Sequence, residues 1–300
     1  MDTKLLQTFV VTAKTLNFHK AAEQLFLAQP TVTQHIRQLE NELRVKLFER
    51  GGRRVRLTPA GERFLYYAVQ VLDLYDQGVQ ELTAWEQGYR ERLILAVSPL
   101  VARSTLPRVV RRFTTLHPAV DVVVNVTGSG EIPPLLMEGK AHLGLSRSPS
   151  ASRDLGGFVW YTDPVILVDR AADHQNGHLP WRKVLARNRL LTQNHPVYWD
   201  DLLLTLHQKG IHVRTMEVSL VDITKIFIEE GLGVSFLPRS TVRKEVAEGR
   251  LVEVPTPDLE LPTAATYVLY PSQSVSPTAR LFMECLHDPD SEEEHEGLRR

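Results

Sequence analysis

Cysteine is nearly absent from this 300-residue chain. The one cysteine, Cys285, cannot form an intramolecular disulfide or a cysteine-based zinc cluster, and we expect a small buried residue on an amphipathic helix. No apolar run approaches the length of a membrane-spanning helix. The first residues, MDTKLLQTFVVTAK, place polar residues between apolar ones at helical spacing, which indicates a helix of a folded domain rather than a secretory signal. We therefore expect a cytoplasmic protein with no membrane partner.

Motifs of the common catalytic and cofactor sites are also missing. Gly128-Ser129-Gly130 follows a predicted strand, but no third glycine stands at the dinucleotide-binding spacing and Pro133-Pro134 interrupts the segment. The eleven histidines form no His-Glu-x-x-His zinc motif, and neither a Gly-x-Ser-x-Gly nucleophile elbow nor a Walker loop occurs. A catalytic role for His142 or His195 would rest on residue type alone. We expect no enzyme activity, no cofactor and no metal.

Two short helices that pack on each other are predicted over residues 19–25 and 29–43. The first carries Ala21 and Ala22, which are small enough to let the second cross closely. The second has an apolar face that we expect to bury against Leu25 and Leu27, formed by Val32, Ile36, Leu39 and Leu43. Its opposite face consists of amides, hydroxyls and one arginine: Gln29, Thr31, Thr33, Gln34, Arg37 and Gln38. Such side chains contact base edges in a DNA major groove, and Pro30 suits the first helical turn.

A β-hairpin with a basic tip is predicted next. Residues 46–50 and 53–57 alternate apolar and polar side chains on either side of Gly51-Gly52, which is typical of a wing that touches phosphates or a minor groove. Residues 1–58 hold ten Lys and Arg against five Asp and Glu, a net charge of +5 in a chain of net charge −1, so the remainder carries −6. This asymmetry favours a nucleic acid partner over a helical cap whose charges are merely solvated. The predicted DNA-binding surface comprises Lys20, Gln29, Pro30, Thr31, Thr33, Gln34, Arg37, Arg53 and Arg54.

A long helix is predicted from Pro59 to about Trp85, with Thr58 as its N-cap. Apolar residues repeat along it at alternating spacings of three and four, as in a coiled coil: Leu65, Ala68, Leu72, Tyr75, Val79 and Leu82. Two such helices would pair and hold two DNA-binding domains at a fixed separation. The alternative is a single amphipathic helix that lies on its own domain, which Phe64, Val69 and Leu74 support.

Strands and helices alternate from residue 90 onwards, which predicts α/β architecture. Strands at residues 93–97, 120–126 and 143–146, with helices at 106–116 and 135–137 between them, should form a parallel sheet. Residues 164–168 would cross into a second lobe with strands at 190–192, 213–218 and 233–237 and helices at 198–207 and 221–230. Residues 266–269 would return to the first lobe, which a helix at 278–286 closes. Two α/β lobes joined by two crossings resemble a periplasmic binding protein.

The run AAEQLFLAQPTVTQHIRQLENEL, followed by KLFER and LTPAG, resembles the N-terminal signature of the LysR-type transcriptional regulators. EEGLGVSFLP and LPRVVRRFTTLHPAV are similar to segments of that family's effector domain, so the resemblance covers nearly the whole chain. Two positions depart from the family pattern. Ala28 replaces a usual Ser or Thr, which removes a side-chain N-cap at a cost of about 1 kcal/mol. Arg44 replaces a usual Gly, where a left-handed residue is often needed.

The resemblance implies a domain organisation. A winged helix-turn-helix would occupy residues 1–58, a dimerising linker helix 59–88, and a two-lobed, periplasmic-binding-protein-like effector domain 89–287. Lobe I would hold residues 89–162 and 265–287, and lobe II residues 163–264. The acidic residues 288–300 are expected to be a disordered tail. Because the family's linker helices pair, a homodimer or homotetramer is expected.

A small-molecule site is expected where strands of both lobes end. In open α/β sheets ligands bind beyond the carboxyl ends of strands, and hydroxyls, backbone N–H groups and an arginine there suit a carboxylate. Arg147 could bind such a group with two hydrogen bonds. The predicted site comprises Ser98, Pro99, Leu100, Val101, Arg103, Thr127, Gly128, Ser129, Arg147, Gln193, Asn194, Val218 and Ser219. The alternatives are helix capping for Ser98 and Thr127 and a surface charge for Arg147.

These patterns predict a bacterial transcriptional regulator that binds double-stranded promoter DNA and responds to an anionic metabolite. A polycarboxylate such as citrate is one candidate effector, and an aromatic acid or an amino acid remains open. The alternative is a solute-binding protein without DNA activity, which would need an export signal and would not need residues 19–57.

Overall fold

The computed structural model describes residues 2–51, 54–174, 177 and 179–286, without the side chains of Arg50, Gly51 and Arg54. The predicted acidic tail at 288–300 lies outside the described residues. Contacts divide the chain into two compact units, Met1–Gly88 and Tyr89–Arg300. No helix in the described ranges is both long and apolar enough to cross a membrane.

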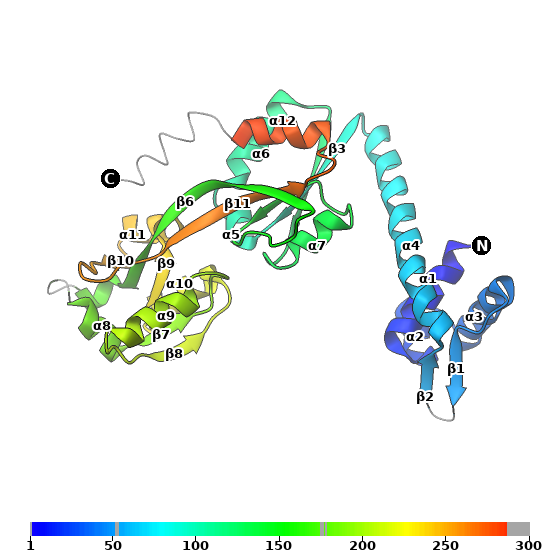
Figure 1. Ribbon diagram of the computed structural model, residues 1–300, viewed down its shortest axis with the longest axis horizontal. Coiled ribbons are helices and arrows are strands. Elements are labelled where there is room, and N and C mark those ends of the chain that lie inside the picture. Colours follow the sequence, from blue (N-terminus) through cyan, green and yellow to red (C-terminus); the bar gives the residue numbers. More distant parts are fainter. Residues whose placement is uncertain (1, 52–53, 175–176, 178, 287–300) are drawn as a thin grey trace. The chain divides into compact units, whose positions relative to one another are not determined.

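The first unit consists of three short helices, a hairpin and a long helix (Figure 1). These are α1 (Thr3–Thr15), α2 (Phe18–Leu25), α3 (Gln29–Leu43), β1 (Phe48–Gly51), β2 (Arg54–Leu57) and α4 (Pro59–Glu86). Side-chain oxygens of Asp2, Asn17 and Thr58 cap α1, α2 and α4. Arg44 ends α3 with a left-handed backbone at φ 56°, so the conformation expected where the family uses glycine is present.

The core of the first unit lies between the faces of α1 to α4. The buried apolar residues of α3 are Val32, Ile36 and Leu39, as their spacing predicts. Leu25 and Leu43 are partly buried against this core. The expectation that α3 would also bury Leu27 is wrong, because that side chain is 38% exposed.

The long helix α4 combines the two arrangements that its sequence allows. The first half of the predicted seam, Leu65, Ala68 and Leu72, packs on the core of its own domain. The second half, Tyr75, Val79 and Leu82, is exposed. The prediction of one continuous seam through all six residues is therefore wrong, because the helix must also cover the apolar faces of α1 and the hairpin.

Lobe I of the second unit is built on a parallel sheet. β3 (Glu91–Val97) lies between β4 (Val120–Val126) and β5 (Leu143–Ser146) and runs parallel to both, as predicted. The crossover helices are α6 (Leu106–Leu116) and α7 (Ile132–Met137), and a short helix that sequence reasoning missed, α5 (Pro99–Arg103), follows β3 directly. The closing helix α12 (Pro277–Leu286) packs on α6 and buries Cys285, as expected.

Two long antiparallel strands join lobe I to lobe II. β6 (Leu155–Arg170) pairs with β11 (Thr263–Pro271) along all of β11, and β11 also pairs with β5 (Figure 1). Beyond this stretch β6 pairs with β9 (Ser235–Pro238) and β10 (Leu251–Val254) of lobe II. The sequence located both crossings but not the length of β6, which begins at Leu155 and includes the apolar run Phe158, Val159, Trp160 and Tyr161 before the crossing.

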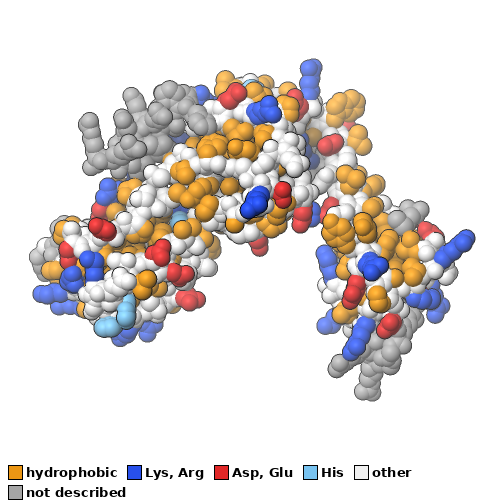
Figure 2. All heavy atoms as spheres, viewed as in Figure 1, with side chains coloured by type: hydrophobic (Ala, Val, Ile, Leu, Met, Phe, Trp, Pro, Cys, Tyr) orange, Lys and Arg blue, Asp and Glu red, His pale blue; other side chains and the backbone are white. Residues whose placement is uncertain are grey.

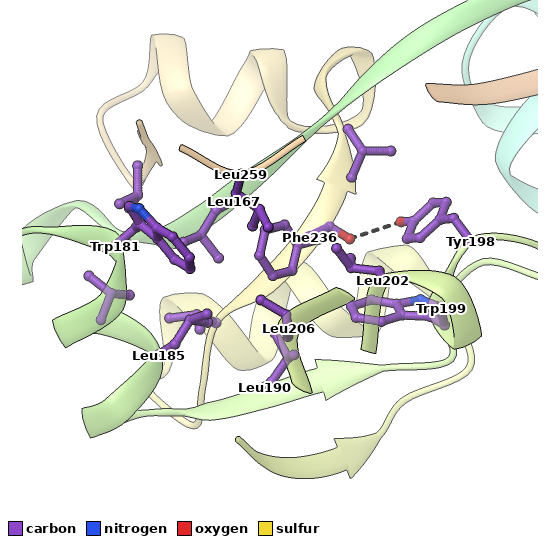
Figure 3. Close-up of a cluster of buried hydrophobic side chains, with 14 of the residues drawn as sticks. Leu167, Trp181, Leu185, Leu190, Tyr198, Trp199, Leu202, Leu206, Phe236 and Leu259 are labelled. Carbon is purple, nitrogen blue, oxygen red and sulfur yellow. Dashed lines mark hydrogen bonds between the residues drawn. The ribbon is translucent and has the colours of Figure 1, made fainter. Parts of the chain in front are cut away.

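Lobe II contains a second, two-stranded parallel sheet and several short helices. β7 (Arg189–Thr192) pairs with β8 (Arg214–Glu217). The helices are η1 (Ala171–His174), α8 (Trp181–Arg187), α9 (Trp199–Gln208), α10 (Val221–Glu229), η2 (Arg239–Val242) and α11 (Arg243–Ala247). Figure 3 shows its aromatic core, in which the Tyr198 hydroxyl donates a hydrogen bond of 2.9 Å to the carbonyl of Phe236. This bond fixes the loop between β7 and α9, which carries part of the cleft described below.

Candidate functional sites

One face of α3 presents polar side chains to solvent. Gln29, Pro30, Gln34 and Arg37 are exposed, and Thr31 and Thr33 are half-buried at the edge of that face. His35 turns inward instead, since its Nδ1 lies 2.9 Å from the Thr8 hydroxyl oxygen. Lys20 is exposed on α2. The exposed face is therefore polar and nearly free of acids over its first two turns.

The first turn of α3 has no side-chain cap, because Ala28 stands at the N-cap position. Backbone N–H groups at an uncapped helix N-terminus seek an external acceptor, and a phosphate oxygen is well suited because the helix dipole favours negative charge there. The departure from the family pattern thus leaves donors available at the end of α3.

The hairpin is held to α3 by a buried carboxylate. Glu40 accepts hydrogen bonds from the backbone N–H groups of Leu47 (2.9 Å) and Phe48 (3.3 Å) and from Lys46 Nζ (2.8 Å). Burial alone would raise the pKa of Glu40, but these hydrogen bonds outweigh it and hold the pKa below its usual value. Of the predicted wing residues, Arg53 lies outside the described residues, and Arg54 belongs to β2 with its side chain not described.

The outward side of α4 carries an exposed apolar stripe, which we call the outer stripe. It consists of Tyr67, Val71, Leu74, Leu82 and Trp85, between 45% and 71% exposed. Gly78 occupies the same line between Leu74 and Leu82. Figure 2 shows apolar side chains on the visible face of this helix. Spacings of three and four keep these residues on one side of the helix, displaced around it from the seam that the sequence suggested.

A cleft of about 250 Å³ opens between the two lobes of the second unit. Loops that follow β3, β4 and β5 line it on one side, and loops that follow β7 and β8 line it on the other. Its lining residues are Ser98, Pro99, Leu100, Gly128, Ser129, Gly130, Arg147, Gln193, Asn194, His195, Pro196, Ser219, Leu220, Val221 and Asp222. Nine of the thirteen predicted effector residues are therefore brought together at the carboxyl ends of parallel strands.

Four of the predicted effector residues do not line this cleft. Val101 and Val218 are buried in the apolar cores of lobe I and lobe II. The Thr127 hydroxyl donates to the Glu131 carboxylate, so that it serves the local turn. Arg103 faces a neighbouring polar hollow and pairs with Asp222.

Arg147 is the cation of the cleft, and it is only 3% exposed. Its Nη1 donates to the Thr266 hydroxyl at 3.0 Å, beside a β-bulge of β11, and its Nε and Nη2 lie 3.2 and 3.1 Å from His195 Nε2. Its backbone N–H donates to Ser129 Oγ at 3.0 Å. No Asp or Glu among the described residues forms an ion pair with it. The buried carboxyl of Asp163 interacts with its charge but forms no direct ion pair with it, so the site favours an anionic ligand that contacts the guanidinium.

His195 enters the cleft from lobe II. Gln193, left-handed at φ 64°, begins the loop that carries it, and the ring stacks on Tyr198 with centroids 4.4 Å apart. Burial and the charge of Arg147 lower the pKa of His195 to about 3, so its imidazole is neutral at physiological pH. Its Nδ1 lies 3.2 Å from the backbone nitrogen of Val197.

Two further polar residues of the cleft differ in how far the protein satisfies them. Ser98 is 2% exposed, and its Oγ has no hydrogen-bond partner among the described residues. Asn194 is fully used inside lobe II, because its amide donates to Thr224 and Ser235 and accepts from Trp199 Nε1. Ser98 is thus available to a ligand and does not cap α5 through its side chain, whereas Asn194 shapes the wall.

Sequence reasoning missed six lining residues: Gly130, His195, Pro196, Leu220, Val221 and Asp222. Each is within three positions of a predicted residue on the same loop. Including the three residues that follow each predicted segment would have added all six to the predicted site. Within the described part of the chain, no group of three or more His, Cys, Asp or Glu residues is placed to hold a metal ion.

Comparison with known proteins identifies the class to which this arrangement belongs. Residues 3–62 match the bacterial regulatory helix-turn-helix proteins of the lysR family, and residues 86–289 match the LysR substrate binding domain. The HTH-type transcriptional regulator CitR of Bacillus subtilis (strain 168) is 46% identical over 272 residues, which cover 90% of this chain and 93% of CitR. The uncharacterized HTH-type transcriptional regulator YxjO of the same organism is 37% identical and covers 96% of this chain and 98% of its own.

Solved structures share the fold. Full-length CbnR complexed with its target DNA superposes with a TM-score of 0.71 at 21% identity, over 95% of this chain and 99% of CbnR. A Vibrio fischeri DarR structure in complex with DNA superposes with a TM-score of 0.62 at 19% identity, over 95% and 98%.

The chain belongs to the LysR family of bacterial regulators. It is a LysR-type transcriptional regulator with a helix-turn-helix DNA-binding domain and an effector-binding domain. A solute-binding protein without DNA activity, the alternative reading of the sequence, does not account for residues 3–62.

Proposed function

We propose that this regulator binds promoter DNA as a homodimer and that a carboxylate metabolite in the cleft between lobes I and II controls it. The observation that carries the effector proposal is the guanidinium of Arg147, which is buried at the cleft without an ion-pair partner in the described chain. A carboxylate would supply a direct ion-pair partner and accept from the remaining guanidinium hydrogens. Citrate is one candidate, and aromatic acids and amino acids are others.

The DNA-binding surface in this proposal is the exposed face of α3 together with the wing. Gln29, Gln34 and Arg37 are exposed there, and amides and guanidinium groups pair with adenine and guanine edges. The uncapped first turn of α3 and the net charge of +5 over residues 1–58 provide contacts to phosphates.

The outer stripe of α4 is the proposed dimer contact in the first unit. Exposed apolar residues at coiled-coil spacing leave apolar surface in contact with water in a monomer. Pairing with the same helix of a second copy would bury that surface. Pairing would place two α3 helices on one DNA molecule.

Effector binding acts by differential affinity. A carboxylate that contacts Arg147 of lobe I and the loop at residues 193–198 of lobe II binds best when the lobes are close together. The family consists of transcriptional regulators, which supports a binding role for the cleft rather than a catalytic one.

A gel-shift assay with the DNA upstream of this protein's own gene tests the proposal. We expect the protein to retard that DNA and expect citrate, benzoate or glutamate to change the affinity or mobility of the complex. No retardation of any upstream fragment would contradict the DNA-binding part. Retardation that is indifferent to every carboxylic acid in a broad panel would contradict the effector part.

A further inference from the structure

His195 makes two contacts that a neutral imidazole cannot satisfy together. Its Nε2 lies 3.2 and 3.1 Å from Nε and Nη2 of Arg147, both of which carry hydrogens. Its Nδ1 lies 3.2 Å from the backbone nitrogen of Val197, which also carries a hydrogen. Both ring nitrogens therefore face donors.

A neutral imidazole has one nitrogen with a hydrogen and one with a lone pair. If Nδ1 carries the hydrogen, Nε2 accepts from Arg147 and the Nδ1 hydrogen opposes the N–H of Val197. If Nε2 carries the hydrogen, Val197 is satisfied and the Nε2 hydrogen opposes the guanidinium. One donor–donor contact remains in either tautomer, and the ring is 4% exposed, so bulk water relieves neither contact readily.

When no anion is bound, the tautomer that satisfies Arg147 is favoured. A hydrogen bond donated by a charged guanidinium is roughly twice as strong as one donated by a neutral amide. Nε2 therefore holds the lone pair, and the bond to Val197 is lost.

We propose that His195 is a tautomeric switch that changes from acceptor to donor when a carboxylate binds beside Arg147. A carboxylate oxygen that inserts between the ring and the guanidinium, whose nearest nitrogens lie 3.1 Å apart and must separate to admit it, accepts from Nε2 and from Arg147 together. Nδ1 is then free to accept from Val197. In the exchange Nδ1 releases one proton to water and Nε2 takes one from water, so the imidazole stays neutral and no other group is oxidised or reduced. The inference rests on the proposed carboxylate site and assigns it a second ligand-binding residue.

Two other features support this role. The stacking of the ring on Tyr198, which is itself anchored to Phe236, holds the imidazole plane in place, so that the guanidinium shifts to admit the ligand and the ring changes only its hydrogen. The buried Ser98 hydroxyl, without a partner in the described structure, lines the same cleft and can take a second oxygen of the ligand.

The switch also links the ligand to lobe II. Restoring the hydrogen bond from Val197 adds a second restraint to the loop between β7 and α9 when the carboxylate is present, beside the bond from Tyr198 to Phe236. Effector binding thereby changes the structure of lobe II through one hydrogen bond, from the backbone N–H of Val197 to His195 Nδ1.

Nuclear magnetic resonance of the full-length protein labelled with ¹⁵N-histidine tests the proposal. Formate serves as the smallest carboxylate probe, with chloride at equal ionic strength as the control, and the His195→Gln variant identifies the signals. In chloride we expect Nδ1 to be protonated and Nε2 to carry the lone pair, and in 100 mM formate we expect the reverse. The same tautomer in both solutions would overturn the proposal. So would an imidazolium in formate, because Nδ1 would then still oppose Val197.

Affinity measurements separate this inference from the proposed function. His195→Phe keeps the stacking on Tyr198 and removes the donor, so formate affinity should fall at least about tenfold. His195→Gln returns a side-chain N–H and should recover most of the loss. Thermal unfolding of both variants checks that they are folded. If Arg147→Gln loses formate and His195→Phe does not, the switch is wrong and the carboxylate site stands. If neither loses formate, the carboxylate site itself is wrong.

Discussion

Arg103 on α5 forms an ion pair with Asp222 on α10, so a charged contact joins lobe I to lobe II beside the cleft. The Arg103 side chain is 66% exposed, and ion pairs this exposed contribute little to stability. Arg147, which follows β5 in the same lobe, is buried and forms no ion pair with the described residues. The two arginines therefore allow a matched comparison, since Arg103 has a direct ion-pair partner and Arg147 has none among the described residues.

Replacing Gln34 by alanine should weaken specific DNA binding by about 1–3 kcal/mol and relax the sequence preference, because base contacts specify the site. Gln34 is exposed near the start of α3. Gln38 is a matched control, because it is an exposed glutamine one turn later whose amide donates to Glu42. Fluorescence anisotropy with cognate and scrambled DNA measures both variants. Equal effects of Gln34→Ala and Gln38→Ala would contradict the assignment of the early turns of α3 to base contact.

Gly61→Ala should destabilise the first unit strongly. An added Cβ would lie 2.2 Å from the carbonyl oxygen of Leu47 in the hairpin, so the helix and the hairpin would have to separate. Gly78→Ala provides the control in the same helix, because nothing lies within 4 Å of its added Cβ. Because Gly78 lies on the outer stripe, the comparison is made at concentrations too low for pairing, where the change should stabilise by about 1 kcal/mol through helix propensity. Thermal unfolding distinguishes the two, and a Gly61→Ala protein as stable as the wild type would contradict the packing described.

Aspartate at both Leu74 and Leu82 should abolish association of the fragment comprising residues 1–88. The two side chains are 69% and 64% exposed on the outer stripe, so the change does not disturb the core of the monomer. A buried unpaired charge in the contact would prevent pairing. Aspartate at Gln80 and Thr83, both exposed on other sides of α4, adds the same charge away from the stripe. Sedimentation should show dimers for the wild type and this control, and monomers for the stripe variant. A monomeric wild-type fragment at high micromolar concentration counts against the stripe.

The neutral His195 should make the second unit sensitive to acid. Its pKa is lowered from a usual value near 6.5 to about 3, by burial and by Arg147. Above pH 6.5 neither the folded nor the unfolded chain protonates it. As the pH falls from 6.5 towards 3, only the unfolded chain takes the proton, so this residue lowers the free energy of unfolding progressively. His195→Gln should therefore lose stability less steeply than the wild type over that range.

Unfolding by urea at several pH values gives the comparison. Tyr198 and Arg147 face the ring, and the nearby Asp163, whose pKa burial raises, titrates in the opposite sense. Only the difference between the two proteins is assigned to His195. Parallel pH profiles would show that the ring takes a proton equally in the folded and unfolded chains.

Local patterns were sufficient to predict most elements of the fold. The amphipathic face of α3 and the alternation of strands and helices after residue 90 both appear in the structure, because each depends on neighbours within one element. The same patterns could not decide which side of α4 is free. Ala68 and Leu72 look like coiled-coil residues in sequence, and only the tertiary packing of α1 and the hairpin shows that they belong to the monomer core.

The candidate cleft shows the same division between local and distant information. Strand ends could be located from sequence, which brought Ser98, Ser129 and Arg147 into the prediction. The direction in which each side chain points could not be predicted from sequence. Val101 and Val218 were expected in the cleft but lie in apolar cores. His195 was missed because its place in the cleft depends on two tertiary contacts. One is with Arg147, 48 positions away in the chain, and the other is the stacking on Tyr198, which no sequence motif encodes.

Thermal unfolding of the wild type, Arg147→Gln and Arg103→Gln with citrate, benzoate and glutamate tests the carboxylate cleft most directly. A ligand that binds the folded chain raises its melting temperature, and removing one partner of a buried Arg–carboxylate pair costs about 2–5 kcal/mol. We expect at least one acid to stabilise the wild type and Arg103→Gln alike and to have no effect on Arg147→Gln. Equal stabilisation of all three proteins by the same acid would show that the effector binds elsewhere.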